Sequence, residues 1–245
     1  MLRRTLVPIL AALALSALFI RLGFWQLSRL AERRARNAIV LARTTQPATT
    51  LETLPADTAA ARFRRVRLDG TFDYAHEVAV TNRIRDGAPG VHLVTPLRTT
   101  TGALVLVDRG WVYSPNGADV DHAHWREADS VHADGYVETF PPHLAGAVRG
   151  ADSMRVRWLS HDDMSRRVGA GLAPFYVMLG GDTTVHDGVP VRVPTPPLDE
   201  GPHFNYALQW FSFAAISLVG MGIWVAAEVR KGKDEGRESR VEGRG

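Results

Sequence analysis

The sequence predicts a membrane protein in which two transmembrane helices flank one β-rich (α+β) domain outside the membrane. Three observations carry this prediction. One apolar run begins at Thr5, a second covers residues 203–227, and alternating apolar and polar residues fill much of the chain between them. A chain of 245 residues, of which 45% are hydrophobic, is long enough for two such helices and one domain of ordinary size.

The first apolar segment, residues 5–27, is predicted to be transmembrane helix 1 and follows a short tail of residues 1–4. About 20 helical residues cross about 30 Å of hydrocarbon. Arg21 interrupts the segment close enough to its end for the long side chain to reach the headgroups. A cleaved signal peptide is the alternative interpretation. The apolar character resumes after Arg21 and continues to Trp25, a residue type found at membrane interfaces, and this favours the helix.

The second apolar segment, residues 203–227, is predicted to be transmembrane helix 2, followed by a charged tail of residues 228–245. Positive charges flank both helices and disagree about orientation. The tails carry Arg3, Arg4, Arg230, Lys231 and Lys233, whereas the stretch after helix 1 carries Arg29, Arg33, Arg34 and Arg36. Positive residues collect on the cytoplasmic side, so the first group places both tails in the cytoplasm and the second group reverses helix 1. The residues alone leave the orientation open.

Residues 28–202 are predicted to form the β-rich domain, beginning with an extended, proline-marked connector over residues 44–61. Strand patterns follow from Arg62 onwards, and the run LVLV at residues 104–107 is apolar on both faces, which is typical of a buried strand. The stretch SHDDMSRRVGAG predicts one helix, with Ser160 as its N-cap and Gly169 at its end. We expect residues 62–182 to be predominantly strand.

The extramembrane region shows no motif of a soluble active site. The chain has no cysteine, which excludes disulfides, thiolate metal sites and cysteine nucleophiles. Its net charge of +3 is scattered, which argues against nucleic acid as a partner. His122 and His124 would share one face of a strand, but no third ligand accompanies them and a surface loop is preferred. In DRGWV we expect a packed Trp111 with Arg109 stacked or paired nearby. No function is predicted for the histidines at positions 76, 92, 132, 143, 161 and 186.

The remaining candidate site lies at the membrane edge. Two antiparallel helices joined by one domain bring the end of helix 1 and the start of helix 2 to the same leaflet. The polar and aromatic groups there are His203, Tyr206, Trp210, Trp25, Gln26 and Arg29. These groups suit an amphipathic porphyrin, because imidazole ligates iron, aromatic rings stack and guanidinium pairs with a propionate. The alternative is an ordinary interface, where aromatic and amide residues are common and a single histidine is solvated.

The same residues carry a family resemblance. LGFWQLSRLAERR, GVHLVTPLRTTTGALVLVDRGWVY and HFNYALQWFSFA occur in this order between and around the two helices. They resemble motifs of the surfeit locus protein 1 family, membrane proteins that assist assembly of haem-copper cytochrome c oxidase. Arg21, where an apolar residue is expected, and the dense arginines after helix 1 depart from the family pattern.

The resemblance implies a protein of the bacterial inner membrane with both termini in the cytoplasm and the β-rich domain in the periplasm. It also implies a role around haem a, bound transiently, with His203 as the iron ligand. We therefore expect a non-enzymatic assembly factor that binds or passes haem a to the oxidase catalytic subunit, with haem a synthase as a further partner. One alternative is a scaffold that stabilises an oxidase intermediate without haem. Another is an unrelated membrane-anchored binding module.

Overall fold

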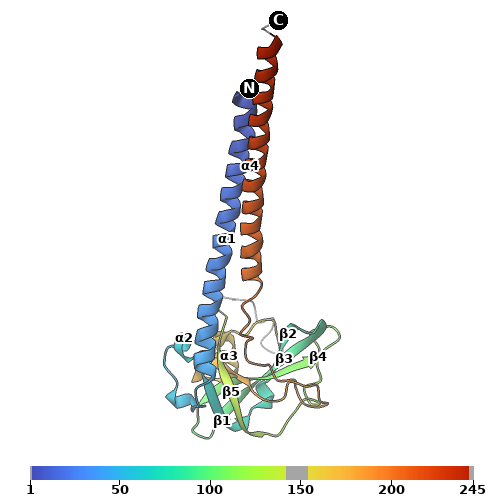
Figure 1. Cartoon of the computed structure of the whole chain (residues 1–245). Coiled ribbons are helices and arrows are strands. Elements are labelled where there is room, and N and C mark those ends of the chain that lie inside the picture. The colour runs from blue at the N-terminus through green and yellow to red at the C-terminus, as the bar shows by residue number, and fades with distance from the viewer. Residues whose placement is uncertain (1, 142–153, 243–245) are drawn as a thin grey trace. The chain divides into compact units, whose positions relative to one another are not determined.

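The computed structural model describes residues 2–141 and 154–242, so His143 and the last three residues of the predicted tail lie outside the described part. The chain divides into two compact units. The helical unit comprises Met1–Ala38 and Leu198–Gly245, and the β unit comprises Ile39–Pro197. Figure 1 labels the four α-helices and strands β1 to β5.

The helical unit contains two long helices, α1 (Leu2–Thr44) and α4 (His203–Glu242). The most apolar 18-residue stretch of each helix has a mean hydropathy of 2.1 in α1 and 1.8 in α4, so both helices are long and apolar enough to span a membrane. The two predicted transmembrane helices are thus present as helices. The arginine-rich residues after position 28, which the sequence assigned to the β-rich domain, continue α1 as far as Thr44.

Within the helical unit the two helices run antiparallel (Figure 1). Gln26 contacts His203, Phe19 stacks on Trp210, and the Ala12 carbonyl oxygen accepts a hydrogen bond from Ser217. Each contact therefore lies seven residues earlier along α1 and seven later along α4. A seven-residue repeat is the signature of helices that keep one stripe facing each other along their length.

Small residues in this stripe allow close approach of the two helices. Ser16, Ala207 and Ala214 are at most 3% exposed, although large apolar side chains elsewhere on both helices are exposed. A Cβ atom built on Gly23 would lie 2.6 Å from the ring of Phe211. Small residues at such positions are typical of helix pairs in membranes, where close packing rather than the hydrophobic effect drives association.

The β unit is built on one seven-stranded sheet. Its strands are β1 (Arg65–Phe72), β2 (Val78–Arg85), β3 (Ala88–Thr99), β4 (Leu104–Tyr113), β5 (Ser130–Thr139), β6 (Arg155–Val156) and β7 (Leu172–Leu179). The strand order is β1-β5-β7-β4-β3-β2-β6, and β1 also pairs with β3. This extra pairing joins the first and fifth strands of the order, so five strands form a closed ring from which β2 and β6 extend. Together with the two long helices, the sheet confirms the predicted fold class.

The core of the β unit lies on both sides of β4, in which nine of ten residues are buried. One cluster, which includes Val105 and Val107, faces β1, β5 and β7. A second cluster, which includes Leu104 and Leu106, is covered by Met164 of helix α3 (His161–Val168). Alternate residues of LVLV thus enter two different clusters, which confirms the prediction of a strand buried on both faces.

The sequence predicted one of the short helices correctly and missed the others. The predicted helix α3 is present, with the Ser160 hydroxyl accepting from the Asp163 amide at 3.4 Å and Gly169 at φ 98° as its C-cap. The segment predicted as an extended connector instead contains two short helical turns, η1 (Leu51–Thr53) and α2 (Thr58–Ala61). Asp57 caps α2 by accepting from the Ala59 amide at 2.9 Å. A third turn, η2 (Tyr74–His76), links β1 and β2.

Candidate functional site: an arginine-lined hollow beside His203

His203 is the first residue of α4, and its imidazole contacts the side chain of Gln26 on α1. The Nδ1 to Oε1 distance is 2.9 Å. An amide oxygen accepts, so Nδ1 is the donor in this pair. No hydrogen bond to Nε2 is found among residues 2–141 and 154–242. The geometry therefore holds one imidazole nitrogen and leaves the other available to a ligand.

A hollow of about 260 Å³ lies beside this imidazole. It is lined by Arg29, Glu32, Arg33, Arg36 and His203. The four α1 residues recur at helical spacings of three and four, which places them on one face of the helix. Three guanidinium groups and one carboxylate make the lining positive overall.

The three arginines differ in their pairing. Arg29 contacts Glu32 at 2.6 Å and lies over the Trp25 ring at 5.9 Å. Arg33 holds the segment that leads into α4, donating from Nε and Nη2 to the backbone and side-chain oxygens of Asp199, each at 3.0 Å. Arg36 has no hydrogen-bond or ion-pair partner in the part of the chain that the structure describes, and it is exposed.

The other predicted site residues lie apart from the hollow. Trp210 is part of the helix–helix stripe, with its ring 5.7 Å from that of Phe19. Tyr206 and Trp25 are 45% and 50% exposed. The structure thus brings together His203, Gln26 and Arg29 of the predicted set.

Sequence reasoning did not place Glu32, Arg33 and Arg36 in the site, because the arginine-rich stretch was interpreted only as evidence on orientation. The helical spacing of its arginines was the available signal. This spacing has a meaning only if helix 1 continues past residue 27, and the sequence predicted that the helix ends there.

A model of the SURF1 family matches residues 13–215, a range that contains every residue lining the hollow. The chain belongs to the SURF1 family. An uncharacterised SURF1-like protein of Mycobacterium bovis is 29% identical over 226 residues, covering 89% of this chain and 81% of the relative. SURF1-like proteins of Rickettsia felis and Monosiga brevicollis are 29% and 25% identical, covering 86% and 92% of this chain and 92% and 89% of the relatives.

Membership of the SURF1 family confirms the resemblance predicted from three sequence motifs. The family is linked to the assembly of cytochrome c oxidase and is an assembly-factor family rather than a catalytic one. Two of the three motifs supply all residues of the hollow except Arg36, which follows the α1 motif by two positions. The third lies on β3 and β4 of the β unit.

The VDRGWV run of this SURF1-family chain holds a buried charged network centred on Arg109, which is 0% exposed. Its guanidinium donates to the Glu77 carboxylate at 2.7 Å, to the Trp125 carbonyl oxygen at 2.8 Å and to Glu127 at 2.8 Å. Arg192 also pairs with Glu127. The prediction that Arg109 is paired close to a packed Trp111 is therefore confirmed, and the network is a structural one because its charges satisfy each other.

Glu77 is the acidic centre of this network. Burial by itself would raise the pKa of Glu77, but hydrogen bonds from His122, Thr95 and Arg109 and the charge of Arg109 together hold it below its ordinary value of 4.5. His122 contacts Glu77 at 2.7 Å, whereas His124 contacts Asp187 at 2.9 Å. The two histidines thus serve different partners, and no metal-binding group of three ligands occurs among the described residues.

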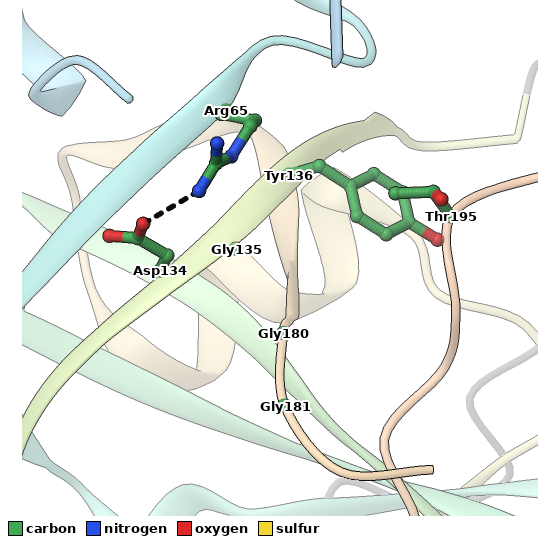
Figure 2. A pocket seen from close by; sticks show the side chains of 7 residues that line it. All are labelled: Arg65, Asp134, Gly135, Tyr136, Gly180, Gly181 and Thr195. Carbon is green, nitrogen blue, oxygen red and sulfur yellow. Dashed lines mark hydrogen bonds and ion pairs between the residues drawn. The ribbon is translucent and has the colours of Figure 1, made fainter. Parts of the chain in front are cut away.

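A second hollow, of about 340 Å³, lies on the β unit (Figure 2). Gly135, Gly180 and Gly181 form part of its lining, and Arg65 pairs with Asp134 at 2.9 Å along one side. The Tyr136 hydroxyl donates to the Pro194 carbonyl oxygen at 3.3 Å, and burial raises the pKa of Tyr136. These polar side chains are directed at partners within the protein, so the hollow beside His203 is the better candidate site.

Proposed function

We propose that this SURF1-family protein assists assembly of haem-copper cytochrome c oxidase by binding haem a, or handing it to the oxidase catalytic subunit, with His203 as the iron ligand. The hydrogen bond between His203 and Gln26 is the observation that carries the proposal. Histidines that ligate metals donate their other ring N–H to a fixed acceptor, which sets the tautomer and the ring orientation. Gln26 supplies that acceptor.

The residues around the hollow fit haem a in their charge and in their chemistry. Haem would supply an iron centre that an imidazole nitrogen can ligate. The chain supplies that nitrogen at His203, guanidinium groups for carboxylates, and the apolar surfaces of α1 and α4 for the rest of an amphipathic ligand. Arg29 remains a candidate for a propionate, and Tyr206, Trp210 and Trp25 remain candidates for ring contacts.

The size of the hollow supports transient rather than permanent binding. Pockets that enclose a small molecule measure about 300–1,000 Å³, and this hollow measures about 260 Å³. It therefore accommodates one edge of a porphyrin and leaves the remainder to the bilayer or to a partner protein. Partial enclosure suits a protein that passes its ligand on.

The proposed location is the bacterial inner membrane, with both termini in the cytoplasm and the β unit in the periplasm. The positive residues of the tails, including Arg4 and Arg230, support this orientation. The proposed partners are the oxidase catalytic subunit, haem a synthase and the bilayer itself. A reporter active only in the periplasm should function when inserted near Asn116 and fail after Gly245. The opposite pattern would overturn the topology.

The decisive experiment compares His203→Ala with His124→Ala in a host that makes haem a. Loss of the metal bond should remove the haem absorbance of the purified His203→Ala protein, while both variants insert into the membrane equally. His124 contacts Asp187 in the β unit, so its replacement should leave the spectrum unchanged. A wild-type spectrum for His203→Ala would exclude His203 as the ligand, whereas a wild-type protein without haem absorbance would favour a scaffold that binds no haem.

A further inference from the structure

We infer that Arg36, together with Arg33, forms the carboxylate-binding part of the site and receives the propionates of the porphyrin. This inference rests on the proposed function, which it extends from the iron ligand to the opposite edge of the ligand. Both arginines line the same hollow as His203. One compact hollow thus offers a metal-ligating nitrogen and two guanidinium groups, the combination that a porphyrin dicarboxylate requires.

The pairing of each arginine decides which of them can bind a ligand at least cost. Arg29 would have to leave Glu32, which it contacts at 2.6 Å. Arg36 has no partner to lose among residues 2–141 and 154–242. An exposed guanidinium with five N–H donors binds a carboxylate through two parallel hydrogen bonds, and no existing ion pair opposes it.

Arg33 contributes in a different way. Two of its nitrogens, Nε and Nη2, are held by Asp199, and its side chain is only 29% exposed. Its Nη1 has no partner in the described part of the chain, so a fixed donor borders the hollow. A pre-ordered donor loses little conformational entropy on binding, which favours a directed contact. Arg33 therefore serves as the rigid donor and Arg36 as the adjustable one.

Arg34 provides the matched control within the same stretch. It donates to the Glu200 carboxylate from Nε and Nη2, at 2.7 and 2.8 Å, and it does not line the hollow. It has the same charge as Arg36 and lies two positions away on the same helix. A general effect of positive charge on binding would appear in Arg34→Gln and Arg36→Gln alike, whereas a carboxylate contact would appear only in Arg36→Gln.

The test measures binding of ferric protoporphyrin IX and of its dimethyl ester to the full chain in detergent by absorbance titration. Arg36→Gln should weaken binding of the diacid about tenfold, since it removes a charge-assisted hydrogen bond. Binding of the ester should not change. The absorbance band of the bound diacid should keep its wild-type position because His203 is intact. Arg36→Lys should recover part of the loss, and Arg34→Gln should match the wild type. Circular dichroism checks that the helix content is preserved.

The outcomes separate this inference from the proposed function. If Arg36→Gln binds diacid and ester as the wild type does, while His203→Ala loses the iron signal, the carboxylate assignment is wrong and the proposed function survives. If His203→Ala keeps the wild-type spectrum, the proposed function fails. Sedimentation with phosphatidylglycerol or phosphatidylcholine vesicles adds a second arm. A loss of phosphatidylglycerol binding in Arg36→Gln with unchanged porphyrin binding would identify a lipid headgroup site and overturn the inference.

Discussion

Arg109 in the β unit and Arg36 in the helical unit are the same residue type in opposite environments. Arg109 is 0% exposed, and all three of its guanidinium nitrogens donate to protein oxygens. Arg36 is exposed, borders a hollow and has no partner among the described residues. Burial with complete pairing makes an arginine part of the fold, whereas exposure beside a hollow leaves its donors for a ligand.

The two units are also stabilised by different interactions. In the β unit, charges are removed from water and depend on each other, so removing one partner leaves another buried and unpaired. In the helical unit, small residues and aromatic rings hold the helices together, and a cluster of exposed charges lies beside the start of α4. Changes to single residues should therefore affect stability in the β unit and helix packing or ligand binding in the helical unit.

The largest effect is expected for Arg109→Met. Glu77, which is 2% exposed, would lose its main counter-charge, and breaking a buried pair in this way costs about 3–5 kcal/mol. Denaturant unfolding of the full chain in detergent measures the change, and hydrogen–deuterium exchange of β4 peptides locates it. Arg126→Gln is the control, because the Arg126 side chain is 54% exposed, pairs with nearby Asp129 and lies over the same Tyr74 ring as Arg109. An equal effect of both variants would remove the distinction between buried and exposed arginines.

The next effect is expected for Gly23→Leu in the helical unit. Even a Cβ atom would lie 2.6 Å from the Phe211 ring, so the bulk of a leucine side chain should displace this ring and push the helices apart, at a cost of about 1–3 kcal/mol. Because the chain has no cysteine, one introduced pair, Ala12→Cys with Ser217→Cys, reports the spacing by disulfide formation. Cross-linking should fall in Gly23→Leu. It should persist in Gly220→Leu, where nothing lies within 4 Å of an added Cβ.

A smaller, pH-dependent effect is expected from Glu77. Its pKa in the folded protein lies below the ordinary value of 4.5, so folding favours the ionised carboxylate. This contribution to stability is fully present above the unfolded pKa and is lost as the pH falls through the folded pKa. Unfolding midpoints measured between pH 7 and pH values below about 4.5 should fall more steeply in the wild type than in Glu77→Gln. Parallel curves would show that Glu77 is not the coupled group.

The smallest effect on stability is expected for Arg34→Gln. Its pair with Glu200 is half exposed, with side-chain exposures of 58% and 48%, and exposed ion pairs contribute little in water. The unfolding midpoint should stay within experimental error of the wild type. A clear loss of stability would mean that the exposed arginines of α1 are structural, which would weaken the contrast with Arg109.

The sequence by itself determined the elements that depend on local pattern. Two apolar runs of sufficient length predicted α1 and α4, the doubly apolar LVLV predicted β4, and Ser160 with Gly169 delimited α3. Each signal acts between residues close in the chain, through hydropathy, side-chain period or capping. Three separated motifs also predicted the family, and the presence of two antiparallel helices predicted that the end of helix 1 lies at the level of His203.

Only the tertiary structure decided which distant groups meet. The pairing of β1 with β3 closes the ring, Arg109 finds Glu77 and Glu127 on separate segments, and Gln26 meets His203 from 177 positions away. The continuation of α1 to Thr44 likewise places Arg33 and Arg36 on one helical face. Such contacts depend on strand register and on helix packing, both of which arise from many weak interactions over the whole fold. No local pattern specifies them, because each segment is compatible with several partners until the chain is packed.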